Sequence, residues 1–161
     1  MSYTFRVQTE SEQQEHRGGA KICDIYDFFT YARELETKMP LALGQLKARF
    51  GEPQYTSKDF ENMYEYNLCA ESDSGEKVYL CAYCGPTGPA IGGMPNDENI
   101  DDAAKALVDY IIEAQPVDYE IEAYYLDGPT KLIHGVKDGV PYSSEEEVAF
   151  DDPELKKLFH F

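Results

Sequence analysis

Two cysteines separated by two residues, Cys81 and Cys84, have the types and spacing that most directly suggest chemistry. Such a pair supplies half of a four-ligand zinc site or the two thiols of a redox centre. No second pair completes a zinc site, and Gly-Pro follows Cys84 where a redox motif would begin a helix. Side chains three apart along a strand also point to opposite faces. We therefore expect structural thiols, including Cys23 and Cys69, with no metal and no cofactor.

The segment directly after this pair, residues 85–93 (GPTGPAIGG), is rich in Gly and Pro and predicts an irregular loop at the end of a strand. It has neither the Lys-Ser/Thr of a P-loop nor the spacing of a dinucleotide-binding motif. Loops that hang from rigid strands often bind ligands. One interpretation is a small-molecule site or enzyme using Gly85, Thr87, Gly92 and Gly93, where alanine at the last two positions would abolish binding without unfolding. The other is a crossover that Gly and Pro only shape.

The remaining candidates for catalysis are weak. The three histidines are scattered, and no serine lies in a G-x-S-x-G motif. The acidic run at residues 97–102 does not match an EF-hand loop, and the dipole of a following helix explains it. No catalytic residue is predicted.

Charge is distributed unevenly along the chain. Residues 1–50 carry seven acidic and seven basic side chains, whereas residues 51–161 carry 24 acidic and seven basic ones, which is the whole net charge of −17. A field this negative repels nucleic acid and anionic membranes and favours a basic partner. Solubility alone is the other explanation.

The sequence also suggests a compartment. No run of about 18 apolar residues is present, and the N-terminal residues lack the apolar stretch of a secretory signal. Four cysteines without such a signal indicate free thiols in a reducing cytoplasm.

The elements that must position these residues follow from periodicity and turn signals. Residues 2–7 alternate as a strand, and residues 8–20 predict a mobile connection. Helices are expected over 24–35 and 40–50, the second ending at Gly51. Residues 63–71 and 78–84 predict a hairpin with Glu71 opposite Glu76 and a ladder of tyrosines on one face.

The C-terminal part begins with an amphipathic helix over residues 100–114. A strand follows at 118–126, and residues 130–136 and 139–142 predict a hairpin around Lys137-Asp138-Gly139. Residues 153–161 predict a short terminal helix. The chain is therefore expected to form a single α+β domain, with an antiparallel or mixed sheet of about five or six strands and helices mainly on one face.

The leading functional hypothesis is a non-enzymatic protein-binding domain. Its most specific form is an inhibitor or immunity protein that masks a basic toxin or nuclease. Strand alternation predicts an outward face whose residues combine acidic charge with an aromatic ring; they are Glu120, Glu122 and Tyr124, extended by Glu145, Glu146 and Glu147. The alternatives are the small-molecule site in residues 85–93 and an oligomeric accessory protein without a ligand.

Overall fold

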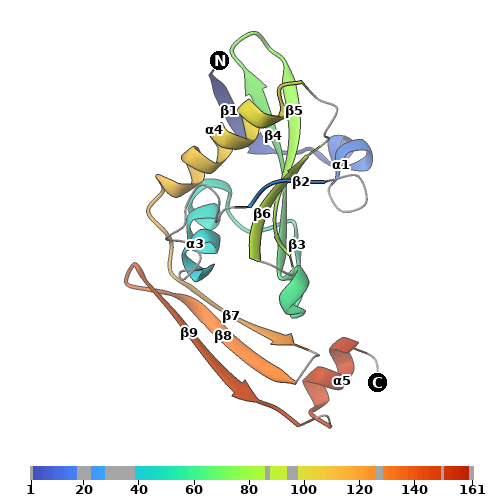
Figure 1. Ribbon diagram of the computed structural model, residues 1–161, viewed down its shortest axis with the longest axis vertical. Helices are drawn as coiled ribbons and strands as arrows, with labels where there is room; N and C mark the ends of the chain where they lie inside the picture. The colour runs from blue at the N-terminus through green and yellow to red at the C-terminus, as the bar shows by residue number, and fades with distance from the viewer. Residues whose placement is uncertain are drawn as a thin grey trace.

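A six-stranded antiparallel sheet forms the centre of the fold (Figure 1). The structure is a computed structural model that describes residues 2–17, 23–27, 39–85, 88–93, 98–125, 129–149 and 151–159. Five strands follow the order β1-β4-β5-β6-β2, and β3 pairs beside β4. Their bounds are β1 Tyr3–Val7, β2 Cys23–Asp27, β3 Tyr55–Thr56, β4 Tyr64–Ser72, β5 Lys77–Gly85 and β6 Gly88–Gly93.

A second antiparallel sheet contains three strands in the order β7-β8-β9. These strands are β7 Tyr119–Tyr125, β8 Thr130–Lys137 and β9 Val140–Glu147. The chain therefore combines helices with antiparallel sheets, as predicted, but the expectation of one sheet is wrong. The strands divide because α4 and the segment after it carry the chain away from the first sheet before β7 begins (Figure 1).

Helices cover both faces of the first sheet. Helices α3 (Met39–Phe50) and α4 (Ile100–Ile112) pack on one face, and α3 also contacts β8 and β9 of the second sheet. Helix α1 (Glu10–His16) lies on the other face, where the His16 ring stacks on Tyr79 with 3.7 Å between ring centroids. The expectation that helices lie mainly on one face is therefore only partly met. A 3-10 helix η2 (Phe60–Asn62) and the terminal helix α5 (Pro153–Phe159) complete the described elements.

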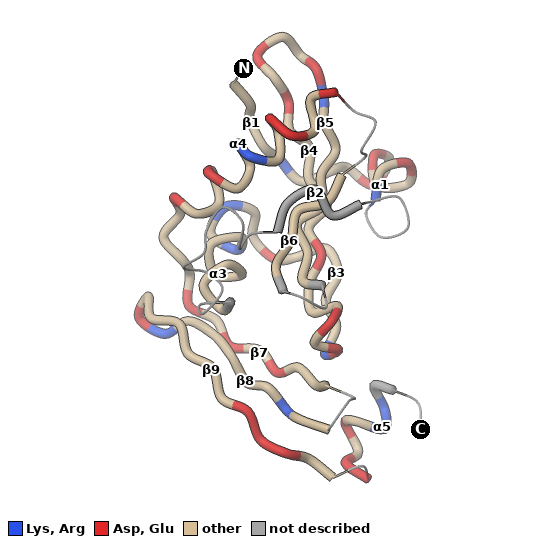
Figure 2. Tube along the Cα trace, viewed as in Figure 1, with Lys and Arg blue, Asp and Glu red and all other residues tan. Residues whose placement is uncertain are grey.

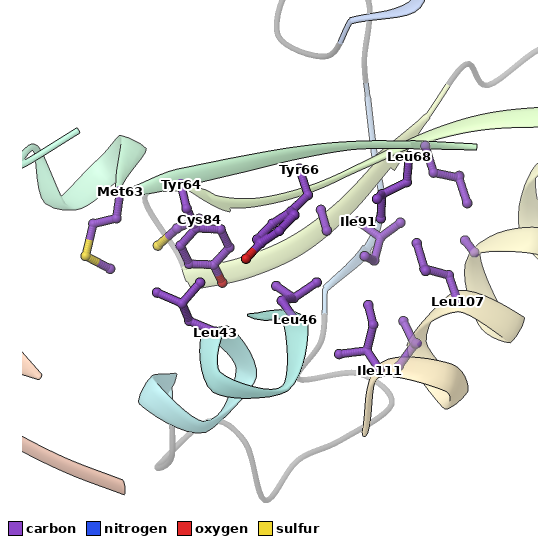
Figure 3. Close-up of a cluster of buried hydrophobic side chains, with 14 of the residues drawn as sticks. Leu43, Leu46, Met63, Tyr64, Tyr66, Leu68, Cys84, Ile91, Leu107 and Ile111 are labelled. Carbon is purple, nitrogen blue, oxygen red and sulfur yellow. The ribbon is translucent and has the colours of Figure 1, made fainter. Parts of the chain in front are cut away.

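The core lies between the first sheet and helices α3 and α4 (Figure 3). On α4 the buried positions recur at the helical period, because one stripe of the helix faces the sheet. Alternate residues of β4 and β5 face the same side. The largest buried side chains in this core include Leu43, Leu46, Tyr66, Leu68, Leu80, Ile91, Leu107 and Ile111.

The β4–β5 hairpin is present, but its predicted register is wrong by one residue. Glu71 lies opposite Lys77, so opposite charges face each other beside the turn. The turn lies one residue later than expected: Ser72 N–H donates to the carbonyl of Glu76 at 2.8 Å, and Gly75 adopts a φ of 88°. Leu68 consequently faces Leu80, and the predicted ladder of facing tyrosines does not form.

The N-terminal third differs most from the prediction. Residues 8–20 were expected to be a connection, yet Thr9 caps helix α1 and forms a capping box with Glu12. The pKa of Glu12 is held well below its usual range by a hydrogen bond from Arg6, whose Nη1 lies 2.6 Å away. The predicted helix over 24–35 is also wrong where it is described, since residues 23–27 pair with β6 as a strand. Its remaining residues lie outside the described part of the chain.

The C-terminal elements occur where they were predicted, except that β9 was expected to end at residue 142 and continues to Glu147. Asp138 and Gly139 have φ angles of 52° and 77°, the left-handed conformations that a tight hairpin turn needs. The carboxylate of Asp118 accepts from both of their backbone N–H groups, at 2.9 Å and 3.2 Å.

Helix α3 ends at the predicted residue, since Gly51 follows it with a φ of 78°.

Candidate functional site

The outer face of the three-stranded sheet carries two of the predicted acidic residues. Glu120 and Glu122 are exposed, as strand alternation requires, while Ala123 is buried. The hydroxyl of Tyr142 on β9 donates to a carboxylate oxygen of Glu120, and this bond raises the pKa of Tyr142. Glu120 is therefore oriented by a side chain two strands away, which reaches it across Gly135 of β8.

One lysine on the same face serves two carboxylates. Lys131 Nζ lies 3.5 Å from Glu122 and 3.9 Å from Glu146, because β8 lies between β7 and β9. The charge of Glu122 raises the pKa of Lys131 above its ordinary value. The three side chains Glu122, Lys131 and Glu146 together keep a net negative charge, because two carboxylates share one ammonium group.

The three consecutive glutamates of β9 divide between the two faces of the sheet. Glu145 lies opposite Leu132 and Glu147 opposite Thr130, whereas Glu146 lies opposite Lys131. All three are exposed because β9 is an edge strand (Figure 2). The structure therefore does not bring the predicted acids onto a single face.

Tyr124 is not an exposed contact residue. Its side chain is only 2% exposed, although alternation places it beside Glu122. The backbone N–H of Tyr124 donates to the carbonyl of Lys58 at 2.7 Å, so an earlier segment of the chain covers this end of β7. Burial raises the pKa of its phenol. The prediction failed because periodicity along β7 contains no information about a segment more than sixty residues away.

Within the Gly/Pro-rich segment, residues 88–93 form strand β6 and Gly85 ends β5, where an irregular loop was expected. Gly92 lies between Cys81 of β5 and Asp24 of β2, and Gly85 lies opposite Gly88. Gly93 is buried against the side chain of Ile100. Thr87 lies outside the described residues. Gly93 allows β6 to pack closely on helix α4, and Gly92 and Gly93 are both buried, so neither lines an accessible loop.

Cys69, Cys81 and Cys84 are buried thiols. Alternation places Cys84 in the core, where its Sγ lies 3.7 Å from the carbonyl oxygen of Phe60, and Cys81 toward the opposite face. Burial raises the pKa of Cys84 to about 12 and that of Cys81 further. These thiols therefore stay protonated and poorly nucleophilic at neutral pH. Among the described residues, no group of three or more His, Cys, Asp or Glu side chains is placed to hold a metal ion.

Two adjoining cavities were not foreseen from the sequence. The first, of about 420 Å³, includes Arg17, Tyr55, Asn62, Glu65 and Cys81 in its lining. The second, of about 430 Å³, is the α3–β7 cavity, with Leu43, Lys47, Lys58, Met63 and Ile121 among its lining residues. Tyr64 lines both. No local motif marks them, because each cavity is lined by segments that lie far apart in the sequence.

Comparisons with protein-family models, with curated proteins and with solved structures find no match to this chain. Among the described residues, the helices are all too short or too polar to cross a membrane. What the protein binds is therefore inferred from its own geometry.

Proposed function

We propose that the protein binds a basic protein partner through its three-stranded sheet. The observation that carries this proposal is the exposed edge strand β9, in which residues 143–147 are all exposed and three consecutive residues are glutamates. Within the strands of this sheet, five glutamates are set against Lys131 and Lys137. A basic surface would be attracted to this sheet over about the Debye length.

The edge of β9 suggests how a partner would dock. Strand β9 pairs with β8 on one side, and no other described strand pairs with it. An extended basic segment would add a fourth strand there, with main-chain hydrogen bonds supplying affinity and Glu145, Glu146 and Glu147 selecting for positive charge. The same charges repel a second copy of β9, which protects the edge from self-association.

An inhibitor or immunity protein that masks a basic toxin or nuclease is the most specific form of this proposal. Such a partner binds nucleic acid through a positive surface, and an acidic sheet would compete for that surface. The same geometry serves any basic partner, so the charge of the partner is the primary claim.

The test compares two triple variants with the same change in charge. In the first, Glu145, Glu146 and Glu147 are replaced by Gln. In the control, the exposed residues Asp73, Asp109 and Glu113, which lie outside the second sheet, become Asn, Asn and Gln. Partners are captured from native lysate at low salt, and their association rates are then measured with purified proteins.

The proposal expects a basic partner whose on-rate falls about tenfold for the β9 variant and by less than about twofold for the control. The on-rate of the wild type should also fall as salt increases. An acidic partner, or equal effects of the two triple variants, would contradict docking at β9.

A further inference from the structure

The phenol of Tyr64 is a buried polar group with no hydrogen-bond partner in the described part of the chain. Its side chain is 3% exposed, and its hydroxyl makes no hydrogen bond to any described residue. A buried hydroxyl without a hydrogen bond destabilises the fold, because it has lost its bonds to water without replacement. Burial also raises its pKa well above the ordinary value, so the hydroxyl keeps its proton and offers a donor.

Tyr64 is one of the residues that line the α3–β7 cavity. Figure 3 shows the Tyr64 side chain extending from β4 toward α3 and ending close to Leu43, another lining residue. Met63 and Ile121 supply further apolar wall. The volume of about 430 Å³ lies within the range of sites that hold small molecules.

The charged residues around the cavity are already paired. Lys47 lies 2.8 Å from Glu52, Lys58 lies 3.3 Å from Glu154, and Glu122 lies 3.5 Å from Lys131. Neither a cation nor an anion in the cavity would therefore find an unneutralised partner among these residues. The negative field of the whole chain further disfavours an anion.

We propose that the α3–β7 cavity binds a small, neutral, mainly apolar molecule that presents a carbonyl or similar acceptor oxygen to the Tyr64 hydroxyl. The apolar wall contributes burial, and the hydroxyl selects among apolar molecules by its hydrogen bond. This site is separate from the edge of β9 and from the glycine-rich strand β6.

The test uses two probes of nearly equal shape, acetophenone and ethylbenzene, of which only the first carries a carbonyl acceptor. Binding is followed by NMR of methyl groups labelled in Met, Leu and Ile. We expect both probes to shift the Met63, Leu43 and Ile121 methyl signals, and acetophenone to bind about fivefold more tightly, as one added hydrogen bond predicts.

Two variants separate recognition from folding. Tyr64→Phe removes the hydroxyl and should equalise the two affinities without lowering the melting temperature, since no hydrogen bond to a described residue is lost. Ile121→Phe places a larger side chain in the cavity wall and should lower the affinity for both probes at least about tenfold. The methyl spectrum of each variant reports whether it is folded.

Three results would overturn the proposal. The first is that neither probe shifts these methyl signals in the wild type. The second is that acetophenone keeps its advantage in Tyr64→Phe. The third is that folded Ile121→Phe binds both probes as tightly as the wild type.

Discussion

The δ-methyl group of Ile100 occupies the space that a side chain at Gly93 would need. A Cβ built at Gly93 would lie far inside van der Waals contact with that methyl group, and 3.2 Å from Leu80. The first residue of α4 is thereby packed directly on β6. Close approach of helix and strand explains why glycine stands at this position, in a segment that was expected to be an irregular loop.

Alanine at Gly93 should destabilise the protein rather than remove a ligand. The added methyl group forces Ile100 and Leu80 to repack, which costs about 1–3 kcal/mol of unfolding free energy. Alanine at Gly135 should lower the unfolding free energy more, because its Cβ would meet the backbone carbonyl of Tyr119. A backbone group cannot move aside as a side chain can. Urea denaturation of both variants measures the difference. Equal stability of Gly93→Ala and wild type would contradict the packing of β6 on α4.

The burial of Tyr124 predicts an effect on stability. Replacing Tyr124 by Ala removes a ring that is 2% exposed, and we expect a loss of about 3 kcal/mol or more in unfolding free energy. The matched control is Tyr55→Ala, because Tyr55 is 39% exposed and should cost less than half as much. Thermal and chemical denaturation supply both values. A larger loss at Tyr55 than at Tyr124 would show that the ring of Tyr124 is accessible.

His134 predicts a loss of stability in mild acid. Burial lowers its pKa to about 4, and its Nε2 has no hydrogen-bond partner among the described residues. The unfolded chain takes up a proton near pH 6.5 while the folded protein does not, so stability falls as pH falls toward 4. With these two pKa values, the free energy of unfolding should fall by about 2 kcal/mol between pH 8 and pH 5.

The variant His134→Gln isolates this contribution, because all other groups titrate alike in the two proteins. The unfolding free energy of the wild type relative to that of the variant should therefore fall by about 2 kcal/mol from pH 8 to pH 5. A difference that is independent of pH would mean that His134 is protonated equally easily in both states.

The buried thiols predict slow chemical modification. In a Cys23→Ser variant, the remaining cysteines are Cys69, Cys81 and Cys84, all of them buried. Raised pKa values and exclusion of solvent should keep all three from reacting with a disulfide reagent until denaturant is added. Spectrophotometric titration counts the thiols. Rapid labelling of any of them in native conditions would contradict this placement.

Sequence by itself determined the elements whose signals are local. The amphipathic period of residues 100–112, the Asp138-Gly139 turn and the alternation that exposes Glu120 and Glu122 all appear in the structure. Each depends on neighbours within one or two turns of the chain. The opposite directions of Cys81 and Cys84 follow from the same period of two.

Only the tertiary structure decided the features that depend on distant partners. Residues 88–93 form a strand despite their Gly and Pro because β5 and β2 supply hydrogen-bonding edges on both sides. Tyr124 is buried where the segment at Lys58 and Asp59 pairs beside β7. The α3–β7 cavity arises from segments far apart in the sequence, so no window of residues could indicate it. Local preferences are fixed by a few adjacent side chains, whereas burial and cavities depend on which segments meet.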